Sequence, residues 1–212
     1  VVSSPPNSSG VPATTAAQRD PACQAALSSF LAGGGKLVVD MGDNDVASGF
    51  LAPGTVGTPD LVFPFDSDVS PTAAALGPDL LAGTADDHPF LKGPDGLPGT
   101  GDDVTEANSD NCCYNSHGNL EQGATLPAGA RQLLLARFNT TPAQRPILAE
   151  YCQGPGRVLV NTMTNGFVAW QPSGSGPAYA QTSMLAYALS PQSNCAWPFT
   201  GFFAPVDNPP VL

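Results

Sequence analysis

The stretch Asp20–Met41, DPACQAALSSFLAGGGKLVVDM, carries the clearest structural signals in the chain. Asp20 followed by Pro21 is typical of a helix start, because Asp caps free backbone N–H groups and Pro suits the first helical position. Apolar residues then recur at helical spacing, and the three glycines 33–35 end the helix. The apolar run 36–41 predicts a buried strand that leads into a polar loop. A helix, a glycine turn and a buried strand in this order predict half of a parallel α/β unit.

Shorter apolar runs predict the remaining elements. We expect strands at residues 1–6, 61–65, 130–138, 146–150 and 157–163, and a closing helix at residues 179–189. Residues 66–125 contain few apolar residues and many turn residues, which is typical of an insertion or of a loop ordered by a ligand.

Four segments together resemble the class I glutamine amidotransferase-like superfamily, and within it the trehalose-utilisation-like branch. They are GGGKLVV at 33–39, HPF at 88–90, PILAEY at 146–151 and GPGRVLV at 154–160. The resemblance implies an α/β domain over residues 1–190, with a flavodoxin-like parallel sheet flanked by helices. It leaves residues 66–125 as a long, irregular, acidic insertion in that domain.

The residues that would carry amidotransferase chemistry are missing. In that family a Cys follows a strand in a tight turn, and a His and a Glu complete the triad. Here the turn after Val39 reads Asp40-Met41-Gly42-Asp43, with no Cys or Ser, and no His follows Val160. We therefore expect a non-catalytic domain, because both the nucleophile and its base are absent.

An enzymatic alternative stays open. Asp40 and Asp43 follow a predicted parallel strand, where α/β folds place ligand sites, and His117 lies in the polar segment NSHGN. These three residues could serve a hydrolase or a carbohydrate-active enzyme as acid–base groups. The competing interpretation makes them solvated loop residues.

The strongest local signal is a repeat with an offset of 16 residues. GPDLLAGTADDH at 77–88 agrees with GPDGLPGTGDDV at 93–104 at eight of twelve positions. The second copy resembles the calcium-binding Asp/Gly repeats of bacterial extracellular proteins. The first copy has Leu80 where the second has Gly96, as in a decayed copy.

Calcium is the cofactor that this composition favours. Residues 77–110 contain eight acids and one base, Lys92, which gives a local charge of −7. Ca²⁺ prefers such hard oxygen ligands, and glycines let the backbone fold around the ion. The expected metal ligands are Asp79, Asp86, Asp87, Asp95, Asp102 and Asp103. A solvated acidic loop with a coincidental repeat is the alternative.

Composition indicates an extracellular or cell-surface protein of bacterial type. Lysine is nearly absent, charged residues make up only 12% of the 212 residues, and the net charge is −11. A polyanion gains no counterion-release energy on nucleic acid, so nucleic acid is excluded as a partner. No apolar run is long enough to span a membrane.

The five cysteines favour disulfides over zinc. No Cys-x-x-Cys pair is present and the chain has only two histidines. We expect at least one disulfide, involving Cys112 or Cys113. Buried, reduced cysteines are the alternative.

The last 22 residues differ in character from the rest. Residues 191–212 are expected to form a linker and the start of a C-terminal β module, because GFFAPVDNPP at 201–210 resembles the opening of the PxKF domain of secreted bacterial proteins. The expected function is that of a structural or binding module in a larger extracellular protein or polymeric assembly. Its partners would be other domains of the same chain, identical subunits or carbohydrate.

Overall fold

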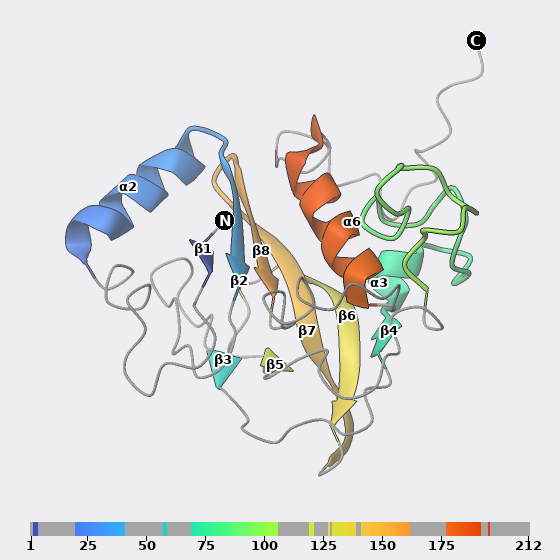
Figure 1. Cartoon of the computed structure of the whole chain (residues 1–212). Coiled ribbons are helices and arrows are strands. Elements are labelled where there is room, and N and C mark those ends of the chain that lie inside the picture. Colours follow the sequence, from blue (N-terminus) through green and yellow to red (C-terminus); the bar gives the residue numbers. More distant parts are fainter. Residues whose placement is uncertain are drawn as a thin grey trace.

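A six-stranded mixed sheet forms the centre of the molecule, with strand order β1-β2-β8-β7-β6-β4 (Figure 1). The computed structural model describes residues 2–3, 20–40, 57–58, 69–105, 119–120, 127, 129–138, 141–161, 177–191 and 195. The strands of this sheet are β1 Val2–Ser3, β2 Lys36–Asp40, β4 Val69–Pro71, β6 Arg131–Phe138, β7 Thr141–Gln153 and β8 Gly156–Asn161. The helices are α2 Pro21–Ala32, α3 Ala73–Leu76 and α6 Pro177–Leu189. A separate two-stranded sheet pairs β3 Gly57–Thr58 with β5 Asn119–Leu120.

The sequence predicted a parallel sheet, but the sheet is mixed. β1, β2 and β8 run parallel, whereas β7, β6 and β4 follow in antiparallel order. The reason is the length of the connections. Only residues 154–155 join β7 to β8, and a connection this short can join antiparallel strands but cannot make the crossover that parallel strands need.

The predicted helix–glycine–strand unit is confirmed. Asp20 is the N-cap of α2, and its Oδ1 accepts a hydrogen bond of 2.7 Å from the backbone N–H of Ala22. Gly34 follows the helix with a φ of 83°, a conformation that glycine adopts without the steric cost of a side chain. The chain then enters β2, which pairs with β1 on one side and β8 on the other.

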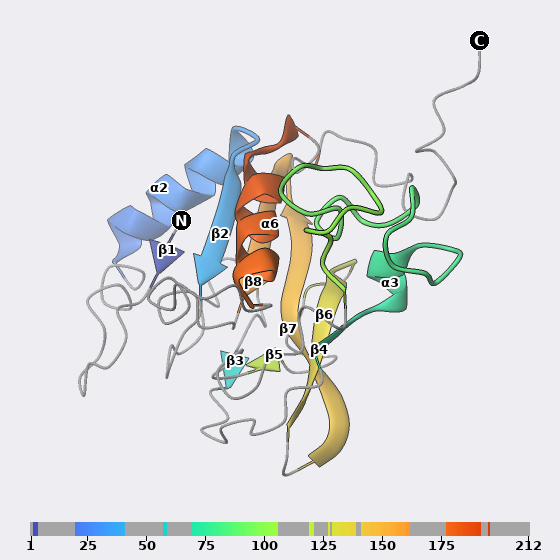
Figure 2. The same ribbon diagram turned by 45° about the vertical axis from the view of Figure 1, so that its right-hand side comes forward.

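Two apolar cores lie on opposite faces of the sheet. Successive residues of a strand point to opposite faces, and in β2 the side chains of Leu37 and Val39 belong to one cluster while Val38 belongs to the other. The first cluster contains Leu31 of α2, and the second contains Met184 of α6. The two helices therefore cover opposite faces of the sheet (Figure 2).

Helix α2 packs closely against β8 at Gly156. A Cβ atom added at this glycine would lie 2.7 Å from Cα of Leu31, which is closer than real Cβ atoms come to a neighbouring backbone. The glycine in the segment GPGRVLV therefore has a packing role at this position.

β7 is longer than the predicted strand 146–150. Its first half, including Pro146, pairs with β6 alone, because pairing with β8 begins at Leu148. A proline is tolerated there because one side of the strand donates no ladder hydrogen bond. The predicted strands at 130–138 and 157–163 and the predicted helix at 179–189 correspond to β6, β8 and α6.

Part of the predicted insertion belongs to the main sheet. β4, inside the range 66–125, pairs antiparallel with β6 and forms one edge of the sheet. The predicted strand 61–65 and the predicted C-terminal module beyond residue 195 lie outside the described residues. Among the helices of the described part, none is long and apolar enough to cross a membrane.

Candidate functional site

The two copies of the repeat, residues 77–88 and 93–104, form one duplicated Asp/Gly loop that follows α3 and ends against the core. Both copies finish in a buried residue at the same repeat position, His88 in the first and Val104 in the second. The backbone N–H of His88 donates to Ala75 O at 2.7 Å, and that of Val104 donates to Leu91 O at 2.8 Å. The loop lies beside the C-terminal half of α6 in both views of the ribbon (Figures 1 and 2).

The first aspartate of each copy shapes a turn in the same way. Oδ1 of Asp79 accepts the backbone N–H of Leu81, and Oδ1 of Asp95 accepts that of Leu97, both at 2.8 Å. A hydrogen bond that an Asp side chain accepts from the backbone N–H two positions on defines an Asx turn.

The second aspartate of each copy closes the loop. Oδ1 of Asp86 accepts from the Thr84 hydroxyl at 2.8 Å, and its Oδ2 accepts the backbone N–H of Asp79 at 3.2 Å. Asp102 accepts from the Thr100 hydroxyl at 2.6 Å and from the backbone N–H of Asp95 at 3.3 Å. The hydrogen bond from the threonine is the main cause that lowers the pKa of Asp86 and of Asp102.

The third aspartate of each copy is the buried one. Oδ2 of Asp87 accepts the backbone N–H groups of Gly83 at 2.6 Å and Thr84 at 2.8 Å. Asp103 accepts those of Gly99 at 2.6 Å and Thr100 at 3.1 Å. Burial raises the pKa of Asp87 to about 6 and also raises the pKa of Asp103.

Glycine is required where each copy begins. Gly77 and Gly93 have φ values of 72° and 66°, and a Cβ atom at either position would collide with Asp86 or Asp102 of the same copy. The first copy has the same left-handed conformation at a position without glycine, because Leu80 has a φ of 59° where Gly96 of the second copy has a φ of 72°. Leu80 therefore marks a substitution that the loop tolerates under strain.

This strain can be relieved. We expect Leu80→Gly to raise the free energy of unfolding of the loop by about 0.5–1 kcal/mol, because the left-handed conformation costs a leucine more than a glycine. Leu80 is largely exposed, so little packing is lost. The matched control is Leu81→Gly, since Leu81 is equally exposed but does not have a positive φ. Hydrogen exchange of residues 77–88 measures both, and a loss of protection in Leu80→Gly would contradict the prediction.

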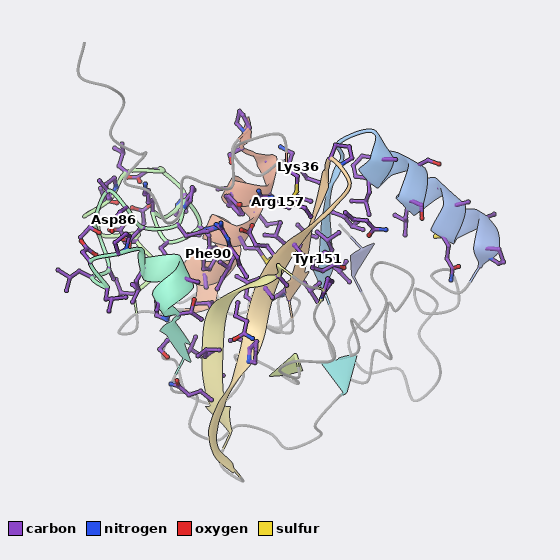
Figure 3. The ribbon with its side chains drawn as sticks, turned by 180° about the vertical axis from the view of Figure 1, so that it is seen from behind. Lys36, Asp86, Phe90, Tyr151 and Arg157 are labelled. Atoms are coloured by element: carbon purple, nitrogen blue, oxygen red, sulfur yellow. A yellow bond between two sulfur atoms is a disulfide. The ribbon has the colours of Figure 1, made fainter. Side chains whose placement is uncertain are left out.

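The structure thus brings all six predicted metal ligands into one duplicated unit. It does not bring three of them to one point, because the described residues contain no group of three or more His, Cys, Asp or Glu side chains that could hold a metal ion. Asp86 is labelled within this loop in Figure 3. Any cation bound here would need backbone carbonyl oxygens or water to complete its coordination.

A cleft of about 530 Å³ separates the second copy from the C-terminal end of α6. Three prolines, Pro89, Pro94 and Pro191, belong to its walls, and its polar side chains are those of Lys92, Asp95, Tyr187 and Ser190. Since the second copy forms one wall, the conformation of that copy determines the shape of the cleft.

Of the three candidate acid–base residues, the structure describes only Asp40. Asp40 is the last residue of β2, at the carboxyl end of a parallel strand, and is the register partner of Asn161 in β8. Asp43, His117, Cys112 and Cys113 lie outside the described residues.

A buried polar cluster beneath the loop was missed from the sequence. Glu150 of β7 is fully buried, and its Oε1 lies 3.0 Å from Nε2 of His88. Its Oε2 accepts from Nη1 of Arg157 at 2.7 Å and from the Tyr187 hydroxyl at 2.8 Å. The signal was available, because Glu150 and Arg157 are charged residues inside strands that are otherwise apolar, and buried charges are normally paired.

This cluster joins four parts of the molecule. The four residues come from the loop, β7, β8 and α6, and Arg157 is labelled between the sheet and α6 in Figure 3. Nδ1 of His88 accepts the backbone N–H of Phe90 at 3.1 Å, so its Nε2 carries the proton donated to Glu150. Burial lowers the pKa of His88. The cluster therefore fixes the end of the first copy to the core.

One disulfide is present in the described part of the chain, as expected, between Cys152 and Cys195. Cys23 on α2 is a free cysteine. The expected involvement of Cys112 or Cys113 is not tested, because both lie outside the described residues.

The fold and this loop together define a mixed α/β domain that carries a duplicated Asp/Gly loop on one side. Comparison with models of protein families finds no match, and comparisons with curated protein sequences and with solved structures find none either.

Proposed function

We propose that the chain is a non-catalytic structural or binding module of a secreted or cell-surface bacterial protein, with a loop ordered by Ca²⁺. The observation that carries this proposal is the duplication of the loop at the level of single hydrogen bonds. Both copies use the same three aspartates for the same three purposes. A loop that was only a solvated connection would not need such a repeated geometry.

The acid–base groups of the described core support a non-catalytic role. His88 and Glu150 form the pair that most resembles a catalytic dyad, but both side chains are fully buried and are held by Arg157 and Tyr187. A substrate cannot reach side chains that are this completely buried. Their hydrogen bonds suit a structural role in attaching the loop to the sheet.

The finer assignment of the fold is part of the proposal. The connection from β1 through α2 to β2, with β8 parallel beside it, is compatible with a flavodoxin-like, amidotransferase-like domain. The module would contact other domains of its own chain, identical subunits or carbohydrate. The cleft beside α6 offers a space that a ligand could enter.

A hydrolase or carbohydrate-active enzyme is the second candidate. The observation in its favour is the position of Asp40 at the carboxyl end of parallel β2, where α/β folds place ligand sites. Asp43 and His117 would complete its acid–base groups. A glycosidase or esterase activity that Asp40→Asn abolished, in a variant with unchanged melting temperature, would favour the enzyme over the module.

Calcium should order the loop. In millimolar Ca²⁺ we expect higher hydrogen-exchange protection of residues 77–105 than in chelator, with the sheet strands unchanged. Extracellular calcium modules bind at roughly 10⁻⁴ to 10⁻³ M. At about ten times the dissociation constant each site then adds about 1.4 kcal/mol to the free energy of unfolding.

The control for this experiment is Mg²⁺ at the same ionic strength, because it tests whether simple screening of the acidic loop accounts for the effect. Equal protection in chelator, Mg²⁺ and Ca²⁺ would refute the calcium-ordered loop. The duplicated loop would then be a self-sufficient, hydrogen-bonded unit.

A further inference from the structure

Asp95 and Gly96, in the second copy of the loop, are the only Asp-Gly pair in the sequence. Both residues are exposed. Oδ1 of Asp95 accepts the backbone N–H of Leu97 at 2.8 Å. Since this hydrogen bond spans Gly96, it closes a ring that contains the backbone nitrogen of Gly96, and it folds the carboxyl group of Asp95 back over that peptide unit.

The backbone nitrogen of Gly96 is the group that can attack the carboxyl carbon of Asp95. Such an attack forms a cyclic succinimide, and a side chain on the residue that carries the nitrogen hinders it. Glycine has no side chain there and the freest backbone of all residues. Even a Cβ atom added to Gly96 would meet nothing within 4 Å, so the space around the reacting atoms is open.

The first copy contains the same turn with an obstructed nitrogen. Oδ1 of Asp79 accepts the backbone N–H of Leu81, also at 2.8 Å, so its carboxyl group is folded back in the same way. The intervening residue is Leu80, whose φ of 59° resembles the 72° of Gly96. The two turns therefore differ at the attacking residue, where one has a leucine side chain and the other has none.

We propose that Asp95 is a site of spontaneous backbone modification, at which the Asp95–Gly96 linkage isomerises to isoaspartate while the Asp79–Leu80 linkage resists. In the first step a bond forms between the nitrogen of Gly96 and Cγ of Asp95. One carboxyl oxygen leaves as water, with the hydrogen of the N–H group and a proton from solution. In the second step water opens the ring and a proton returns to solution.

The second step decides the product. Water that attacks Cγ restores aspartate, whereas water that attacks the backbone carbonyl carbon of Asp95 breaks its bond to the nitrogen of Gly96 and gives isoaspartate. The main chain then runs through Cβ and Cγ of Asp95 and is longer by one methylene group. The reaction consumes as much water as it releases and transfers no electrons, so it needs no further reactant.

Isoaspartate at this position would disrupt the second copy. The hydrogen bonds that Leu97 donates to Asp95, and that the backbone N–H of Asp95 donates to Asp102 at 3.3 Å, both depend on the normal backbone. Asp95 and Gly96 also line the cleft beside α6, so the shape of the cleft would change. This inference goes beyond the proposed function and does not depend on it.

The test compares the fresh full chain with the same chain kept for several weeks in neutral buffer. Peptide mapping with electron-based fragmentation distinguishes isoaspartate from aspartate at each position. We expect isoaspartate to accumulate at Asp95 and to be at least several-fold less abundant at Asp79. Equal accumulation at both positions would overturn the role of the following residue.

Exchanging the two following residues should exchange the behaviour of the two copies. Leu80→Gly should create a second site of isomerisation at Asp79, and Gly96→Leu should reduce isomerisation of Asp95 to the level seen at Asp79 in the original chain. The first copy already holds a leucine at this φ, so Gly96→Leu should fold, which its melting temperature checks. If neither variant changes its copy, the inference is wrong.

Two further measurements test the role of the folded turn. Hydrogen exchange should show that ageing lowers the protection of residues 93–104 and leaves that of residues 77–88 unchanged, whereas Gly96→Leu should keep both. Isoaspartate that forms only in chain unfolded by denaturant would mean that the turn protects Asp95, and would overturn the inference. Isoaspartate with unchanged protection of residues 93–104 would overturn its structural consequence.

Discussion

Replacing Glu150 with glutamine should lower the free energy of unfolding by about 3–5 kcal/mol, the largest effect that we expect from a single substitution. Glu150 is the acceptor for His88, Arg157 and Tyr187, and all four side chains are buried. Without its charge, the guanidinium of Arg157 stays in the core with no compensating anion in this cluster. Denaturant unfolding of both proteins at neutral pH measures the difference.

The double variant Glu150→Gln with Arg157→Met is the control for this interpretation. Removing both charges should recover a substantial part of the loss, because replacing a buried ion pair with apolar groups is often close to neutral. If the double variant is less stable than Glu150→Gln by the full cost of a second, independent substitution, the two residues do not act as a pair.

The same pair predicts a loss of stability in acid. The pKa of Glu150 is lowered to about 2, because its positive and hydrogen-bonding partners outweigh the effect of burial. A carboxylate whose folded pKa lies below its unfolded value stabilises the protein above the unfolded pKa, near 4.5, and loses that contribution as the pH falls toward 2. The difference in stability between the original chain and Glu150→Gln should therefore shrink between pH 4.5 and 2. A difference that is constant with pH would contradict the charged state of Glu150.

Loss of the Cys152–Cys195 disulfide should be the second largest effect. The two cysteines are 43 residues apart in the sequence, and they join the end of β7 to the chain that follows α6. Closing a loop of this length in the unfolded state corresponds to about 4 kcal/mol in the chain-entropy model, with typical measured values of about 2–4 kcal/mol. We expect Cys195→Ser to lower the free energy of unfolding by this amount.

Cys23→Ser is the matched control, because Cys23 is free and makes no disulfide. It should change the free energy of unfolding by less than about 1 kcal/mol. A reductant should destabilise the original chain more than it destabilises Cys195→Ser, because only the original chain contains the Cys152–Cys195 bridge. Equal stability of Cys195→Ser and the original chain would show that the unfolded state is already restricted without the bridge.

Features that depend on residues close together in the chain could be predicted from the sequence, whereas features that depend on distant residues could not. The N-cap at Asp20, the glycine turn and β2 were predicted correctly, because each signal acts within a few residues. The repeat was also visible in the sequence, and the hydrogen bonds that its aspartate side chains accept span at most seven residues. The predicted roles of Asp40, Asp43 and His117 remain predictions.

The sequence by itself determined the local elements of this protein: the capped helix, the buried strands and the two copies of the acidic loop. Only the tertiary structure decided that the sheet is mixed, that Cys152 pairs with Cys195 and that Glu150 joins His88 across 62 residues of chain. It also decided which aspartate of each copy is buried. Asp86 and Asp87 are the same type of residue, and only the packing of the loop against the core distinguishes them. Capping and turn formation act through neighbours in the chain, whereas strand order, burial and charge pairing depend on contacts that exist only after the chain has folded.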